Sequence, residues 1–158
     1  VFKLKMILNF KNKKDKNLEK FDLLKIVCLL IHAAKIDENY TDKEKKIILD
    51  FIIAFSKHER ITNENVKEIN LEQANSLVKE AEVYENNSNH ILEYTREVKK
   101  MDIELKTLIL EAIWQIVLSD DKSGIYESSL IRRICGLLYI PDKLSGDIKM
   151  NLLKRKKI

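Results

Sequence analysis

Apolar residues recur at intervals of three and four positions along most of the chain, a pattern typical of amphipathic helices. We expect an all-α fold, because no run with the pattern of a β-strand lies between turn-forming residues. The pattern predicts a compact bundle of about seven helices, with no linker that divides it. The expected ranges are about 17–36, 41–55, 70–83, 90–100, 101–118, 125–138 and a last helix from about 142.

Local signals mark several boundaries of these helices. Thr41 and Glu44 have the spacing of a capping box, in which the Thr hydroxyl accepts from the Glu amide and the Glu carboxylate accepts from the Thr amide. Pro141 interrupts the helical pattern, and Asp142 suits the N-cap of the last helix. Residues 84–88 are expected to form the turn between the third and fourth helices.

The width of each apolar face indicates where a helix lies in the bundle. The segment 101–118 is the most apolar, so we expect it at the centre. The segments 70–83 and 90–100 have narrower apolar faces, so we expect them outside, bridging two halves of the molecule. On the first helix, Leu24, Val27 and Ile31 share one apolar face.

Two pairs of carboxylates repeat at the same spacing. Asp37 is followed seven residues later by Glu44, and Asp120 is followed seven residues later by Glu127. The pairs lie 83 positions apart, and each spans a short polar gap between two apolar helical runs. This repeat predicts two related helix-loop-helix units packed around a pseudo-twofold axis.

The position of each pair allows three interpretations. The Asp follows the end of a helix, where the dipole disfavours a carboxylate, and the Glu lies in the first turn of the next helix, where the dipole favours one. Both residues could simply cap the loop and the helix. Each loop could instead bind a hard divalent cation weakly. Alternatively, the loops could form an acidic surface that recognises a basic partner.

The two units resemble the TerB-like fold of tellurite-resistance proteins, which is shared by the N-terminal domain of DjlA-type co-chaperones. That family has a helix ending in small residues, then Asp-Gly, a short polar stretch, and Glu at the start of the next helix. The matching positions are 32–37 with 41–44 in the first unit, and 117–120 with 126–127 in the second. The resemblance extends from about 21 to 141.

This resemblance implies an all-helical fold, a non-enzymatic role, and a link to tellurite or metal stress. It also implies divalent-cation binding at four carboxylates, which are Asp37, Glu44, Asp120 and Glu127. The sequence departs from the family pattern at the Gly position, where Glu38 and Asp121 stand. A loop that needs a positive φ there would be strained or reshaped. Co-chaperone activity is not expected, because the His-Pro-Asp tripeptide of a J-domain does not occur.

No group of residues in the sequence has the spacing of a catalytic or zinc site, so we do not expect an enzyme. The Gly-rich phosphate loop and the Cys-x-x-Cys motif do not occur either. His32 lies in an apolar helical run, where we expect a hydrogen-bonded histidine at the edge of the core rather than a metal ligand. Cys28 and Cys135 also lie in apolar runs, which favours two buried thiols over a disulfide.

The length of the chain predicts its domain organisation, and its charge distribution predicts the kind of partner. The 158 residues suit one domain, and we expect a basic N-terminal segment over 1–16 followed by the helical domain over 17–158. Residues 1–20 carry a net charge of +5, residues 139–158 of +4, and residues 58–104 of −5. These patches favour protein partners. Nucleic acid is not expected, because no helix-turn-helix arrangement is evident.

The N-terminal segment allows two further interpretations. Its apolar residues alternate with lysines, so it could lie on an anionic membrane surface, or it could close the bundle as a first helix. No apolar run has the length needed to cross a bilayer, and the N-terminus lacks the profile of a signal peptide. We therefore expect a cytoplasmic protein that can contact a membrane surface.

Overall fold

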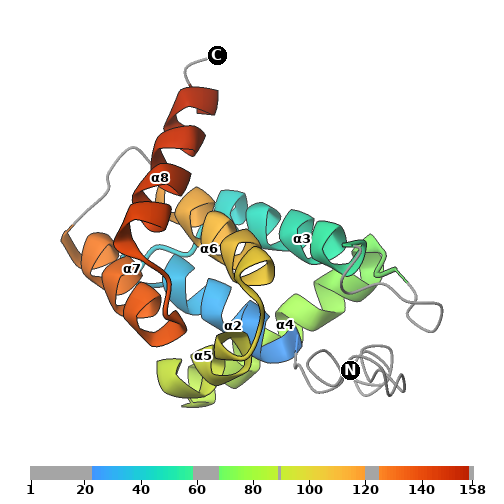
Figure 1. Ribbon diagram of the computed structural model, residues 1–158. Helices are drawn as coiled ribbons and strands as arrows, with labels where there is room; N and C mark the ends of the chain where they lie inside the picture. Colours follow the sequence, from blue (N-terminus) through green and yellow to red (C-terminus); the bar gives the residue numbers. More distant parts are fainter. Residues whose placement is uncertain (1–22, 59–67, 89, 120–124, 157–158) are drawn as a thin grey trace.

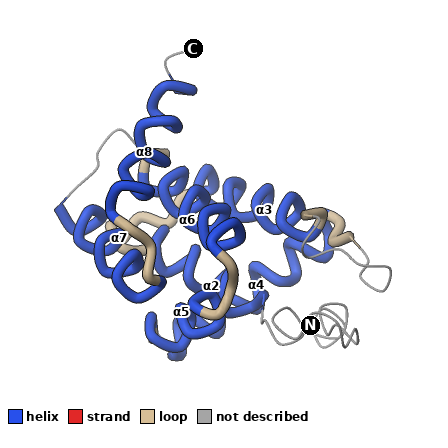
Figure 2. The backbone as a smooth tube through the Cα atoms, viewed as in Figure 1, coloured by secondary structure: helices blue, strands red, loops and turns tan. Residues whose placement is uncertain are grey.

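The computed structural model describes residues 23–58, 68–88, 90–119 and 125–156, and these segments form seven α-helices and no strands (Figure 1 and Figure 2). The helices are α2 (Leu23–Ala34), α3 (Asp42–Ser56), α4 (Leu71–Ser88), α5 (Ile91–Lys99), α6 (Ile103–Val117), α7 (Ile125–Leu138) and α8 (Asp142–Lys156). The predicted fold class is therefore confirmed. The expected segment 1–16 and the expected start of the first helix at 17 lie outside the described residues.

Helix α2 lies at the centre of the bundle and packs against α3, α4, α5 and α6 (Figure 1). Ten of its twelve residues are buried, so the prediction of a single apolar face was too narrow. Only Lys25 and His32 are partly exposed. Burying a Leu or Ile side chain contributes roughly 1.5–3 kcal/mol, which makes this short helix the main source of core stability.

Helix α6 also lies centrally, as predicted, and packs against α2, α3, α7 and α8. The prediction that the third and fourth helices both bridge the two halves holds for only one of them. Helix α5 packs against α2 and α7, and so connects the halves. Helix α4 packs chiefly against α2 and α3, because its buried residues face those two helices.

The predicted repeat is visible in the packing within each half of the molecule. Helices α2, α3 and α4 all contact one another, and α6, α7 and α8 do the same. The packing between the halves is not symmetric, however. Helix α3 packs extensively on α6, whereas its counterpart α7 packs on α5 and makes at most marginal contact with α2. The helices within each half therefore pack alike, but the contacts between the halves do not follow a pseudo-twofold axis.

The prediction of a turn over 84–88 was wrong, because α4 continues to Ser88. The buried positions of α4 keep a helical period through Leu77, Val78 and Ala81 to Glu85. The polar residues at this end suggested a turn, but Glu85 is buried and hydrogen-bonded to another helix. A tertiary contact thus stabilises the last part of α4, residues 84–88, which local sequence preference did not support.

Polar side chains fix the starts of helices and the position of the last ones. The Thr41–Glu44 capping box at the start of α3 is present as predicted. The Lys106 ammonium donates to the carbonyl of Leu138 at the end of α7, at 2.9 Å. The Trp114 indole donates to the hydroxyl of Ser145 on α8, at 3.0 Å. These two bonds anchor α7 and α8 to α6.

The two cysteines agree with the prediction from their apolar surroundings. Cys28 and Cys135 are both buried and are not joined by a disulfide. Burial raises the pKa of the Cys135 thiol. Among the residues that the structure describes, no helix combines the length and apolarity that a bilayer-spanning helix needs.

Candidate functional site

Asp37 lies in the loop between α2 and α3, here named the first elbow (35–41), and its partner Glu44 lies in the first turn of α3. Asp37 is exposed, and its Oδ1 accepts a hydrogen bond from the amide of Asn39 at 3.0 Å. The amide of Glu38 donates to the carbonyl of Lys35 at 2.9 Å. An Asp that binds an amide two residues on is typical of a tight turn. The elbow therefore holds the Asp37 carboxylate in a defined, solvent-accessible position.

Glu38 has a φ of 62°, in the left-handed region. This is one of the two positions at which the sequence departs from the Asp-Gly of the family pattern, and the loop here keeps a positive φ. The other position, Asp121, lies outside the described residues. An L-residue in this conformation brings its Cβ close to a carbonyl oxygen, which costs roughly 1–2 kcal/mol. The elbow keeps the turn that glycine would favour, although it carries a glutamate.

Glu44 is buried at the start of α3, with 4% of its surface exposed. Its Oε1 accepts from the amide of Thr41 at 3.1 Å and from the hydroxyl of Thr41 at 2.9 Å. The capping interpretation is thus correct for Glu44. It does not exclude a ligand, because a carboxylate can accept further contacts.

The structure describes only one residue of the second acidic pair, and only its backbone. Asp120 lies outside the described residues, and Glu127 is placed in α7 by its backbone while its side chain is not described. Cation binding at Asp37, Glu44, Asp120 and Glu127 therefore stays a prediction. Within the described segments, no group of three or more His, Cys, Asp or Glu side chains could hold a metal ion. The first elbow alone supplies two carboxylates, so any ion there would need water or backbone carbonyls to complete its coordination.

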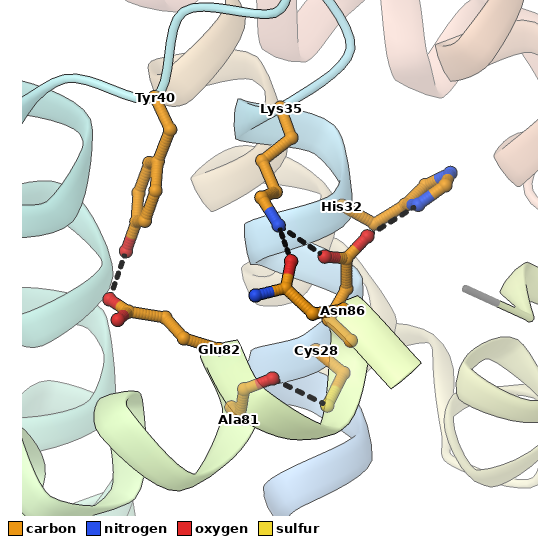
Figure 3. Close-up of polar contacts among 8 residues, drawn as sticks. Cys28, His32, Lys35, Tyr40, Ala81, Glu82 and Asn86 are labelled. Carbon is orange, nitrogen blue, oxygen red and sulfur yellow. Dashed lines mark hydrogen bonds and ion pairs between the residues drawn. The ribbon is translucent and has the colours of Figure 1, made fainter. Parts of the chain in front are cut away.

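A second polar cluster, which we name the polar seam, lies between α2 and α4 beside the first elbow (Figure 3). On α2 it consists of Lys25, Cys28 and His32, which share one stripe of the helix, and Lys35 continues this stripe just past the end of α2. On α4 it consists of Ala81, Tyr84, Glu85 and Asn86, and Glu93 of α5 joins it at one end. The seam is the only polar stripe on a helix that is otherwise buried in apolar contacts.

Glu85 is the centre of this seam. Its side chain is only 6% exposed, and its two carboxylate oxygens face two different side chains, an imidazole and an ammonium. Oε1 lies 3.3 Å from Nδ1 of His32, and Oε2 accepts from Nζ of Lys35 at 2.7 Å. Lys35 also donates to the side chain of Asn86. An open pocket of about 350 Å³ adjoins this cluster and is bordered by Glu38 of the elbow.

The other end of the seam is an ion pair with a tyrosine. Lys25 donates to both Tyr84 and Glu93, and the Tyr84 hydroxyl donates to the same Glu93 carboxylate. The hydrogen bonds from Lys25 and Tyr84 lower the pKa of Glu93. Burial alone would lower the pKa of Lys25, but its bonds to Glu93 and Tyr84 outweigh burial and raise that pKa above its ordinary value. Both groups are therefore charged over a wide pH range.

A third contact joins the far end of the elbow to α4. The Tyr40 hydroxyl donates to Oε1 of Glu82 at 3.0 Å (Figure 3), and Nζ of Lys45 lies 3.2 Å from the same oxygen. Burial and the negative charge of Glu82 raise the pKa of Tyr40, so the phenol stays protonated. The elbow is thus held to α4 by Lys35 on one side and Tyr40 on the other.

The sequence predicted the elbow but did not predict the seam. His32 was expected to be hydrogen-bonded at the edge of the core, and this is confirmed by its contact with Glu85. The partners were missed because 84–88 was assigned to a turn. One signal was available, since Glu85 follows Ala81 by four positions and continues the apolar face of α4.

Comparison with known proteins gives one match. The family model described as tellurite resistance protein TerB matches residues 23–150. No curated protein and no solved structure gives a match.

Proposed function

Because the chain belongs to the TerB family of tellurite-resistance proteins, we propose that it is a non-enzymatic binding module that acts in the response to tellurite or metal stress. The family match covers most of the chain and includes the first elbow and the segment that contains Asp120 before α7, which we name the second elbow. We assign no catalytic residues. The seam carries charged groups, but each of its carboxylates is engaged by a cation of the same chain.

The finer proposal is weak binding of a divalent cation at the two elbows. Its ligands would be Asp37, Glu44, Asp120 and Glu127. The observation that carries this proposal is the exposed Asp37 carboxylate, which the Asn39 amide orients within a tight turn. Carboxylate, carbonyl and water oxygens are the ligands that hard cations prefer. The neighbouring Glu38 adds a further negative charge that attracts a cation to the elbow.

Titration with magnesium, calcium, manganese and zinc, followed by amide NMR, tests this proposal. We expect shifts or paramagnetic broadening confined to the two elbows and saturating in the millimolar range, roughly as for weak extracellular calcium modules. The double substitution Asp37→Asn with Asp120→Asn should abolish them. Asp50→Asn is the matched control, because Asp50 is an exposed carboxylate on α3 outside the elbow.

The second candidate function is that of a protein-interaction adaptor that needs no metal. It is favoured by a pocket between α3, α6 and α8 that has an apolar lining and two exposed cationic side chains. No amide shift with any of the four ions, in a chain that stays folded, would contradict the cation proposal and leave the adaptor as the better one.

A further inference from the structure

A groove of about 330 Å³ opens beside the helices α3, α6 and α8, and we name it the α8 groove. Figure 1 shows where these three helices meet. The apolar lining of the groove consists of Ile47, Leu118 and Leu152, one from each of these three segments. A groove of this size accommodates a few apolar side chains. It is open to solvent, so a segment of another protein can enter it from the side.

Both charged residues in the described lining of the groove are cationic. Lys43 of α3 and Arg155 of α8 contribute to its lining, and its described lining includes no Asp or Glu. Both residues are exposed. Within the described part of the chain, Lys43 has no ion pair, and Arg155 lies 3.2 Å from Glu111 in an exposed pair. Exposed pairs contribute about 0–1 kcal/mol, so Arg155 can exchange this partner for another carboxylate.

The apolar lining and the two cations together define the complementary partner. We propose that the α8 groove binds an acidic amphipathic segment of a partner protein, with apolar side chains in the groove and carboxylates beside Lys43 and Arg155. This inference identifies the surface and partner chemistry of the adaptor function proposed above, and it does not need a bound cation. A basic segment, such as residues 1–16 of this chain with lysines at 3, 5, 11, 13, 14 and 16, would meet like charge there.

The probe is a synthetic helical peptide of about twelve residues, with leucines one turn apart and glutamates on both flanks. Amide NMR of the full chain should show shifts gathered around Ile47, Leu118 and Leu152 when this peptide is added. A peptide with lysine in place of each glutamate and one with serine in place of each leucine are the matched controls. Neither should produce these shifts at the same concentration.

Reversing the charges of Lys43 and Arg155 tests whether these two side chains bind the carboxylates of the peptide. The double substitution Lys43→Glu with Arg155→Glu should weaken the glutamate peptide about tenfold and allow the lysine peptide to bind at the same place. The control variant is Lys46→Glu with Lys154→Glu, which changes the net charge equally on the same two helices but outside the groove lining. It should leave the affinity for the glutamate peptide within about twofold.

Four outcomes would overturn the proposal. They are the absence of binding at millimolar peptide, equal binding of the lysine peptide to the unchanged chain, shifts located away from the groove, and equal weakening by the control variant. Binding to vesicles of anionic phospholipid that only the groove substitutions abolish would assign the groove to a lipid surface instead. An elbow that binds no cation leaves this test unaffected, so the two proposals fail separately.

Discussion

Glu38 shows how a single residue can conflict with the turn that contains it. Its φ of 62° lies in a region that glycine enters without steric cost. We expect Glu38→Gly to stabilise the protein by about 1 kcal/mol. Urea denaturation followed by circular dichroism would measure the change in the free energy of unfolding.

The control for this substitution is Glu38→Ala, which removes the same charge but keeps the Cβ. If Ala stabilised the chain as much as Gly, the effect would come from the charge rather than from backbone strain. The cation-binding proposal predicts a second effect of these two substitutions. Both should weaken cation affinity at the first elbow slightly and equally, because both remove one nearby carboxylate.

The Lys25–Glu93 pair predicts how stability depends on pH. The pKa of Glu93 is below its ordinary value of 4.5, so its contribution is present above pH 4.5 and is lost as the pH falls through the lowered value. The pKa of Lys25 is above its ordinary value of 10.5, so its contribution is present below pH 10.5 and is lost as the pH rises further.

We therefore expect the stability difference between the unchanged chain and Glu93→Gln to be constant between about pH 4.5 and 10.5 and to shrink outside that window. Denaturant unfolding at a series of pH values measures it. A difference that varies strongly near pH 7 would contradict this prediction.

At the scale of elements, the polar seam determines how α4 attaches to α2. Removing the Glu85 carboxylate leaves His32 and Lys35 without their shared acceptor at the edge of the core. We expect Glu85→Ala to lower the free energy of unfolding by about 2 kcal/mol. Glu80→Ala on the same helix is the control, and an equal loss there would indicate reduced helix charge rather than a broken seam.

Helix α7 depends on one buried lysine in a similar way. Lys106 is 9% exposed, and its ammonium binds the Leu138 carbonyl at the negative end of the α7 dipole. We expect Lys106→Met, which keeps an unbranched stem but removes the ammonium, to destabilise the protein by about 1–3 kcal/mol. Lys100→Met is the exposed control. Hydrogen exchange should speed up most in the last turn of α7.

The sequence predicted most of the helices because their apolar residues follow a regular period, and this pattern is local. It missed the end of α4 because Tyr84 and Glu85 are polar, and polar residues near asparagines favour a turn. Their partners are Lys25, His32 and Lys35, which lie fifty or more positions earlier in these contacts. Pairing at that separation is not encoded in any local window, so the seam could not be predicted.

The sequence also predicted part of the candidate site. The role of Glu44 in the capping box follows from its spacing to Thr41, and the structure confirms it. The exposure of Asp37 depends on how the loop turns, which the neighbouring Asn39 amide decides. Convergence of the two elbows depends on the packing between the halves, and the sequence repeat does not fix that packing.

At the scale of the whole molecule, the two thiols report on different parts of the bundle. Cys28 lies in α2, which other helices cover on every side, and Cys135 lies in the α7 region nearer the edge. We expect Cys28 to react with a thiol reagent only through global unfolding, and Cys135 to react sooner through local opening. Labelling of Cys28→Ala and Cys135→Ala variants in increasing denaturant separates the two. Equal rates without denaturant would contradict this order.

The first elbow is fastened at both of its ends to a single helix, by Lys35 through Glu85 and by Tyr40 through Glu82. A loop that is attached at both ends in this way tolerates substitutions between those ends but not insertions or deletions. One inserted residue between 36 and 39 would oblige either the lysine or the tyrosine to release its carboxylate. The spacing of Glu82 and Glu85 on α4 therefore limits the length of this loop. Homologous chains with a longer loop would have to attach it through other contacts.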